Sequence, residues 1–343
     1  MNYGCKTDFD VSGDYEEVAV VHFIIDKTDT THFLKLNKTF LGEGNANVFA
    51  QVPDSSYFDN VEARVMEVDP GSGDITREWL LKDTIIENKE PGAFYYPEQL
   101  LYCFNAHDLD PTKRYRLHID IENGKHIVTS QEGSDLELVD GVSMTSPIQN
   151  IPFRFYHNGE YATQSIRFSL GNAHIYNTQF FFRYRERNND GTSSIETMRW
   201  NLGDLNKDNI IGTNGSAMAS GERFYELVRE QVVENSEVFQ RRVHEIETLI
   251  TAGSEELHLY MLTNQPTSGL TQNKPEYSNV DGGLGIFTSR LTVNQIKPVH
   301  VQESNARALS TQSTDYLCRG PVTVHLDFCS HIPPDQDSDF SCN

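Results

Sequence analysis

The sequence predicts a mainly β protein with two β-sandwich-like domains, the second of which carries one packed amphipathic helix. Three observations lead to this fold class. Apolar and polar residues alternate with a period of two in several segments, turn residues separate these segments, and only one segment has a clear helical period. Apolar residues make up 37% of the 343 residues, which is enough to build cores in two domains of ordinary size.

The first domain is predicted from short alternating segments. Every odd position of residues 115–122 is apolar and every even position is polar or charged, as in an antiparallel sheet with one solvated face. Residues 61–65 alternate in the same way and lead into a turn at 69–74, whereas residues 17–25 are more continuously apolar and predict a central strand. No helical period occurs before about residue 220. This pattern predicts an immunoglobulin-like β-sandwich over residues 15–140.

The second domain is predicted from a junction, further strands and one helix. The polar stretch 140–147 breaks the alternation, and strand character resumes after it. We therefore expect a β-rich domain over residues 150–331, followed by a disordered tail at 332–343. Its predicted strands include 166–170, 180–185, 257–261 and 322–328. The spacing of Phe224, Leu227, Val228 and Val232 predicts a helix near 221–234 that packs on a sheet.

The net charge limits the classes of partner, and the cysteines bear on the cellular compartment. A formal net charge of −22 excludes the basic footprint that nucleic-acid binding needs, so we expect no nucleic-acid partner. No apolar stretch reaches the roughly 18 residues of a membrane-spanning helix, so any membrane contact is expected through a lipid only. Four dispersed cysteines leave disulfide pairing open in an oxidising compartment, namely Cys103, Cys318, Cys329 and Cys342.

The amino-terminal cysteine predicts an anchor. Gly4-Cys5 is followed by a polar, acidic leader, as after cleavage of a bacterial lipoprotein signal. We therefore interpret residues 1–14 as a leader with lipid on Cys5, and the rest as a body tethered to a membrane. The alternative is a free cysteine in a disordered terminus.

Candidate metal ligands occur in one segment. Asp204, Asn206 and Asp208 match positions 1, 3 and 5 of a calcium loop. The match then fails, because Asn209 replaces the glycine of position 6 and Gly215 replaces the glutamate of position 12. We therefore predict weak calcium binding at most, and no other cofactor.

No catalytic signature stands out. The sequence lacks a Gly-x-Ser-x-Gly elbow, a P-loop and a dinucleotide fingerprint, and His244-Glu245 lacks the second histidine of a zinc protease helix. These absences favour a non-enzymatic binding protein. Two alternatives remain, a glycan-active enzyme with two facing carboxyl groups and a structural adhesin or fimbria-like subunit. Candidate ligand-binding aromatics are Tyr95, Tyr96, Tyr102 and Tyr161, whose alternative role is sandwich core.

A glycine-rich segment suggests a family. Residues 275–290 read Pro-Glu-Tyr-Ser-Asn-Val-Asp-Gly-Gly-Leu-Gly-Ile-Phe-Thr-Ser-Arg, in which the glycines allow either a tight bend that returns Ile286 and Phe287 to the core or a ligand-contact loop. We favour the bend, because no acid, base or phosphate-binding helix follows. The segment resembles the P-x-Y-(S/T)-N-(I/V)-x-G-G/I-G-x-F stretch of an uncharacterised family of Bacteroidota outer-membrane lipoproteins. Residues 91–95 extend the resemblance.

The resemblance implies a location and a role. Members of that family carry a lipidated amino-terminal cysteine, a β-sandwich and a longer β-rich region, and are often encoded near TonB-dependent receptors. By this resemblance Cys5 is lipidated, and Lys6, Asp8 and Asp10 look like the short signal that sends such lipoproteins to the cell surface. This sequence departs from the pattern in beginning at Met1, just before the cysteine, so we expect that a signal peptide has been trimmed or left unannotated. The implied partner is an outer-membrane protein or a surface ligand, and no catalytic residue is implied.

Overall fold

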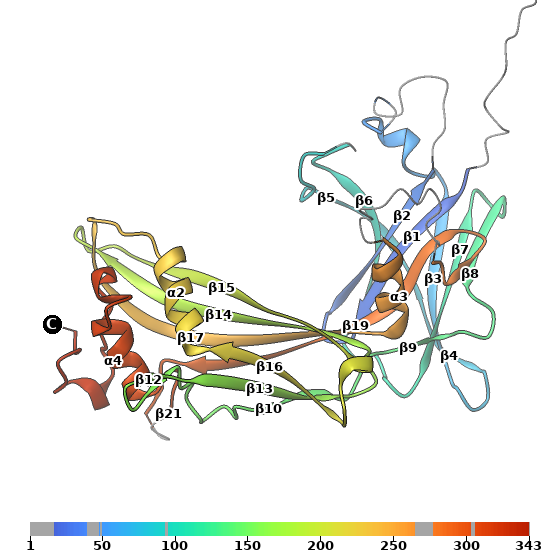
Figure 1. Ribbon diagram of the computed structural model, residues 1–343. Helices are drawn as coiled ribbons and strands as arrows, with labels where there is room; N and C mark the ends of the chain where they lie inside the picture. The colour runs from blue at the N-terminus through green and yellow to red at the C-terminus, as the bar shows by residue number, and fades with distance from the viewer. Residues whose placement is uncertain are drawn as a thin grey trace, which may run out of the picture. The chain divides into compact units, whose positions relative to one another are not determined.

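The computed structural model describes residues 17–39, 48, 50–92, 95–264, 277–302 and 306–342. It is mainly β, which confirms the predicted fold class. The chain divides into two units (Figure 1). The first runs to Leu138 and includes Leu259–Ser289, and the second comprises Val139–His258 and the residues from Arg290 onward. The sequence-based division differs at one point, because it assigned residues 259–289 to the second domain.

The first unit is a sandwich of two antiparallel sheets. One sheet has the order β1 (Ala19–Asp26), β2 (Thr31–Lys38), β6 (Gln99–Asn105) and β5 (Lys82–Ile86), with the start of β19 (Leu284–Pro298) beside β1. The other has the order β18 (Val280–Asp281), β8 (His126–Ser130), β7 (Arg114–Ile121), β3 (Val61–Val68) and β4 (Ile75–Leu80), and β9 (Leu136–Glu137) pairs with β7. The apolar side chains of β7 are fully buried, as its alternation predicts.

The glycine-rich segment forms the tight turn between β18 in one sheet and β19 in the other. Gly285 has φ +112°, and a Cβ atom there would lie 1.9 Å from the carbonyl oxygen of Val21 on β1. Gly282 has φ +75°, and its Cβ would lie 2.0 Å from the carbonyl oxygen of Ile127. Only glycine accepts both the left-handed backbone and the close approach. These two contacts bring the turn against both sheets of the sandwich.

One asparagine side chain bridges this turn. The Asn279 side chain donates to the carbonyl oxygen of Phe287 at 2.7 Å and accepts from its amide at 2.8 Å. Ile286 and Phe287 then enter the core of the first unit. The predicted tight bend is therefore confirmed, and it explains why residues 277–289 belong to the first unit.

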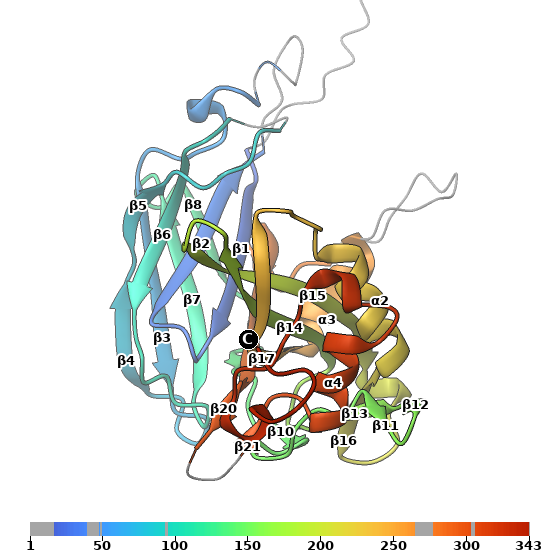
Figure 2. The same ribbon diagram turned by 90° about the vertical axis from the view of Figure 1, so that its left-hand side faces the viewer.

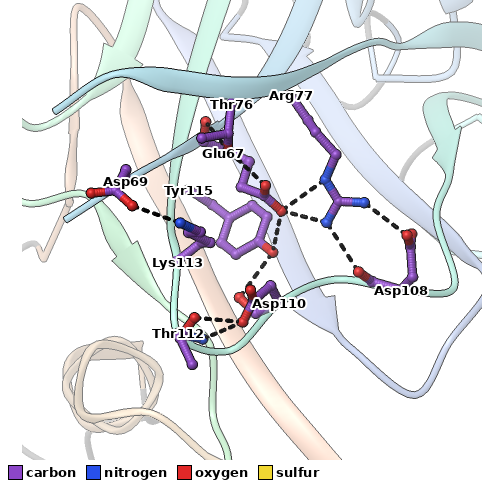
Figure 3. A network of polar contacts seen from close by, with 9 residues as sticks. All are labelled: Glu67, Asp69, Thr76, Arg77, Asp108, Asp110, Thr112, Lys113 and Tyr115. Carbon is purple, nitrogen blue, oxygen red and sulfur yellow. Dashed lines mark hydrogen bonds and ion pairs between the residues drawn. The ribbon is translucent and has the colours of Figure 1, made fainter. Parts of the chain in front are cut away.

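A network around a buried carboxylate holds the edge of the second sheet (Figure 3). Glu67 of β3 is only 4% exposed and accepts hydrogen bonds from Arg77 and Thr76 of β4. The Tyr115 hydroxyl lies 3.2 Å from the same carboxylate and 3.1 Å from the Asp110 carbonyl oxygen. Burial raises the pKa of Glu67, but the hydrogen bonds from Arg77 and Thr76 outweigh it and lower the pKa below its usual range. This network fixes β3, β4 and β7 relative to one another.

The second unit contains a long sheet, a short sheet and helices. The long sheet has the order β15 (Ser193–Asn206), β14 (Ile175–Asn188), β17 (Val238–Gly253) and the remainder of β19. The short sheet consists of β10 (Val142–Ser146), β13 (Thr163–Leu170) and β16 (Asn214–Ser220). Two small hairpins pair β11 (Tyr156–His157) with β12 (Glu160–Tyr161) and β20 (His300–Val301) with β21 (Ala306–Arg307).

The predicted amphipathic helix is present as α2 (Gly221–Gln231). Ser220 caps it by accepting a hydrogen bond from the Arg223 amide. Phe224, Leu227 and Val228 are buried in the core of the second unit, so the predicted packing face is confirmed.

Two predicted strands are helical, and these predictions are wrong. Residues 257–261 lie in α3 (Glu255–Asn264), none of whose residues is buried, so their alternation does not reflect a buried face. Ser254 accepts a hydrogen bond from the Leu257 amide at 3.3 Å and begins the helix. Residues 322–328 follow α4 (Thr311–Arg319) and contain the 3-10 turn Val324–Leu326, and the left-handed Asp327 ends any extended run.

The carboxyl-terminal segment is folded, which corrects the predicted disordered tail. A disulfide joins Cys329 to Cys342. The buried Asp335 accepts two hydrogen bonds from Arg307, at 2.9 and 2.8 Å. This segment, red in Figure 2, is held along β17 because the Cys329 amide donates to the Arg241 carbonyl oxygen at 2.9 Å. Paired charges and a crosslink stabilise a segment whose composition alone indicates disorder.

Candidate functional site

A cavity of about 480 Å³ opens in the first unit. Its volume lies in the range of ordinary ligand pockets. The lining comes from the start of β3, from β5, β6 and β7, and from the turns beside them. The residues are Phe58, Asp59, Asn60, Val61, Glu62, Leu81, Asp83, Leu100, Tyr102, Asp120 and Asn123.

Tyr102 is the polar group most deeply buried in this lining. It belongs to the inner face of β6 and is only 6% exposed. No described residue forms a hydrogen bond with its hydroxyl, which is left to the cavity. Burial, and then the charge of Asp83, raise the pKa of Tyr102 to about 12, so the hydroxyl keeps its proton at neutral pH. The cavity therefore holds a neutral donor without a partner.

The rim of the cavity is acidic. Asp59 and Asp83 form no ion pair within the described ranges of the chain. Glu62 pairs with Arg64, and Asp120 accepts from the Gly124 amide at 2.6 Å. Two carboxylates are thus left to attract a cation beside the buried tyrosine.

A second cavity of about 320 Å³ adjoins the first. The two share Phe58, Asp59 and Leu100, and the second adds Tyr57 and Tyr95. The Tyr95 hydroxyl donates to Glu98 at 3.2 Å, and this bond raises the pKa of Tyr95. We call the two cavities together the Tyr102 cleft.

The predicted tyrosines separate into two groups. Tyr95 and Tyr102 both line the Tyr102 cleft. Tyr102 also belongs to the sandwich core, which is the alternative role that the sequence allowed for these tyrosines. Tyr96 is 43% exposed and does not line either cavity. Tyr161 lies in the second unit, where its hydroxyl is 2.7 Å from that of Tyr316. The structure therefore brings together two of the four predicted aromatics.

The predicted calcium ligands have other partners. Asp204 accepts a hydrogen bond from the Asn177 side chain at 2.7 Å, and Asn206 accepts from the Asp208 amide at 2.9 Å. The Asp208 carboxylate lies 3.4 Å from His174. In the part of the chain that the structure describes, no group of three or more His, Cys, Asp or Glu side chains is arranged to hold a metal ion. Calcium binding at this segment stays a prediction.

The predicted anchor lies outside the described residues. This applies to Cys5 and to the export signal at Lys6, Asp8 and Asp10. No helix among the described residues is long and apolar enough to cross a membrane.

Sequence reasoning missed most of the cleft. Phe58, Asp59 and Asp83 come from separate turns and strands, and no local pattern connects them. The one feature of the sequence that indicated a binding site here was the group of tyrosines in and before β6, namely Tyr95, Tyr96 and Tyr102.

These features define a β-sandwich protein with a ligand-sized cleft in its first unit. The chain belongs to the family described as Domain of unknown function (DUF4249), whose profile matches residues 8–295. No curated protein matches the sequence. Among solved structures, the C-terminal globular domain of an oligosaccharyltransferase from Pyrococcus abyssi is similar at 13% identity and a TM-score of 0.19. That match covers 60% of this chain and 39% of the other.

Proposed function

We propose that the protein is a non-enzymatic, lipid-anchored outer-membrane accessory protein that binds a partner protein or ligand beside a TonB-dependent transporter. The observation that carries the proposal is the Tyr102 cleft, in which the Tyr102 hydroxyl, without a hydrogen-bond partner among the described residues, lies beside two unpaired carboxylates. A ligand can bind such open groups, because its hydrogen bonds and ion pairs with them replace their contacts with water.

The chemistry of the cleft favours a cationic group. Asp59 and Asp83 supply negative charge and Tyr102 supplies a hydrogen-bonding group, whereas the buried Phe58 ring already has the ammonium of Lys38 5.7 Å from its centroid. An ammonium or guanidinium group gains charge-assisted hydrogen bonds in such a site. We propose that the cleft receives a lysine or arginine side chain of the partner protein.

The proposed location rests on a crosslink and on the leader. The Cys329–Cys342 disulfide fits an oxidising compartment outside the cytoplasm, because disulfides rarely persist in reducing surroundings. Cys5, next to Gly4, is the proposed site of lipid attachment. This combination supports an exported protein that is anchored by its amino terminus.

We also propose that the sandwich of the first unit is immunoglobulin-like. The Tyr115 hydroxyl, near the start of β7, contacts the Asp110 carbonyl oxygen five residues upstream at 3.1 Å. This contact has the form of the tyrosine corner of immunoglobulin-like sandwiches. The Trp79 ring stacks on Tyr115 with a centroid distance of 6.4 Å, as a core aromatic of such a sandwich would.

The proposal predicts loss of partner binding when the cleft is changed. The tagged full chain is used to recover its partner from detergent-solubilised outer membranes, and the bound protein is quantified. Asp83→Asn removes one unpaired charge, so we expect about tenfold weaker recovery. Tyr102→Phe removes only the hydroxyl and should weaken recovery about three- to tenfold while leaving the melting temperature unchanged, since that hydroxyl has no partner in the described protein.

Matched substitutions outside the cleft serve as controls. Asp74→Asn changes the same charge in an exposed turn, and Tyr161→Phe removes a hydroxyl in the second unit. Neither should alter recovery. Recovery of the protein alone, or equal losses in the control variants, would contradict the proposal. In the same preparation the native protein should partition into detergent and Cys5→Ser into the aqueous phase, and partition of both into water would refute the anchor.

A glycan-active enzyme remains the second candidate. The cleft is lined by six carboxyl side chains, and two facing carboxyl groups are what glycoside hydrolysis requires. Release of reducing sugar from a polysaccharide by the purified protein, lost in Asp83→Asn, would favour this function over passive binding.

A further inference from the structure

Three arginines meet on one face of the long sheet in the second unit. Arg185 of β14 and Arg242 of β17 are direct partners in the antiparallel register, and Arg187 lies two residues along β14 on the same face. Like charges directly opposite each other destabilise a sheet. The chain nevertheless keeps this arrangement although its formal net charge is −22.

No carboxylate neutralises these arginines in the part of the chain that the structure describes. Arg185 donates to the Ser193 hydroxyl at 3.3 Å, and Arg242 donates to the Gln240 side chain at 2.8 Å. The guanidinium of Arg187 lies over the Phe239 ring, 5.3 Å from its centroid. All three contacts are with neutral groups, so the positive charges remain available.

The next arginine along β14 provides the contrast. Arg183 donates to Glu245 at 2.7 Å and to Glu247 at 2.5 Å, both on β17. On this pair of strands, β17 therefore provides glutamates that neutralise Arg183 of β14. Opposite Arg185 of β14, β17 provides Arg242, which has the same charge.

Two histidines adjoin the cluster. His244 lies two residues from Arg242 on β17, and His331 comes from the carboxyl-terminal segment. Burial, and then the charges of Arg242 and Arg185, lower the pKa of His331, which places that side chain within their electrostatic reach. Burial, and then Arg187 and Arg185, also lower the pKa of Arg242.

Contacts on the opposite face of the sheet fix the position of the arginine cluster. Arg241 is 1% exposed and donates to Glu186, on the opposite face of the same two strands, at 2.7 Å. Its carbonyl oxygen accepts from the Cys329 amide at 2.9 Å, and this holds the segment that carries His331. The guanidinium groups therefore project from a supported sheet rather than from a loop.

We propose that Arg185, Arg187 and Arg242 form a binding site for a phosphate-type oxyanion, carried either by a free phosphate compound or by a lipid headgroup. A guanidinium presents two parallel N–H donors that match two oxygens of a phosphate, and several such groups together bind a multiply charged anion. Bound phosphate relieves the repulsion between Arg185 and Arg242. The site belongs to the second unit and does not depend on the Tyr102 cleft.

Calorimetric titration of the full chain tests the site with two probes. One is inorganic pyrophosphate, and the other is vesicles of phosphatidylglycerol compared with vesicles of phosphatidylcholine. We expect saturable, salt-sensitive binding of pyrophosphate, weakened about tenfold in Arg185→Gln and in Arg242→Gln. Binding of pyrophosphate without the anionic vesicles identifies a soluble phosphate as ligand, and binding of both identifies a headgroup.

A charge-matched variant and a thermal measurement complete the test. Arg229→Gln removes an exposed arginine of α2 and should bind pyrophosphate like the native protein. Without anion, Arg242→Gln should melt at the same temperature as the native protein or higher, since a like-charge contact is removed, and should lose the stabilisation that pyrophosphate gives the native protein. Absence of saturable binding to either probe, or equal binding by the arginine variants, overturns the proposal.

Discussion

Replacing Gly285 by alanine is expected to lower the free energy of unfolding by more than about 3 kcal/mol. The residue has φ +112°, and the new Cβ atom would lie 1.9 Å from the carbonyl oxygen of Val21. That oxygen belongs to the backbone of β1, so it cannot move aside as a flexible side chain would. Urea denaturation followed by circular dichroism measures the loss.

Gly73→Ala separates the steric part of this effect from the backbone part. Gly73 also has a left-handed backbone, with φ +80°, but a Cβ atom there would meet nothing within 4 Å. We expect a loss of about 1 kcal/mol for this variant. Equal losses for the two variants would show that the close approach to β1 contributes nothing, and would reopen the ligand-contact interpretation of the glycine-rich segment.

Arg241→Ala is expected to cost about 3 to 5 kcal/mol of stability. The arginine is almost fully buried and pairs with Glu186 at 2.7 Å. It also donates to the carbonyl oxygens of Leu326 and Val233, each at 2.8 Å. Alanine leaves a carboxylate and two carbonyl oxygens without their donor, and the carboxyl-terminal segment loses the side-chain hydrogen bond from Arg241 to Leu326 and keeps only backbone bonds to Arg241.

Thermal unfolding and limited proteolysis measure this loss of stability. Early cleavage after residue 320 is expected in Arg241→Ala, because that segment is released first. Arg154→Ala provides the control, since Arg154 is exposed and its substitution should change stability by less than about 0.5 kcal/mol. A native melting temperature in Arg241→Ala would contradict the role assigned to the buried arginine.

The sequence predicted those elements whose pattern follows burial. In β7 every second residue is apolar and buried, and in α2 the apolar spacing matches the face that packs in the core. The prediction failed at 257–261, because an exposed helix places no demand on its apolar spacing. It also failed for the carboxyl-terminal segment, where a disulfide and the Arg307–Asp335 pair add to the burial of Ile332 and Phe340.

The Tyr102 cleft was only partly predictable for a related reason. Tyr95 and Tyr102 stand out locally as aromatic residues, but Asp59 and Asp83 are ordinary polar residues until the sheets assemble. Likewise, the meeting of Arg185 with Arg242 depends on the register of two strands, which no single segment of the sequence contains. Pairing between distant strands therefore decides which candidate residues form a site.

Photo-crosslinking from inside the cleft tests partner binding most directly. A photoreactive phenylalanine analogue replaces Ile85, an exposed residue of the cleft lining, in the anchored full chain, and a second protein carries it at Ile75, an exposed position of the same unit. We predict that irradiation in outer membranes joins position 85 to one defined outer-membrane protein and leaves position 75 without that product. Identical products at both positions, or none at position 85, would contradict partner binding by the Tyr102 cleft.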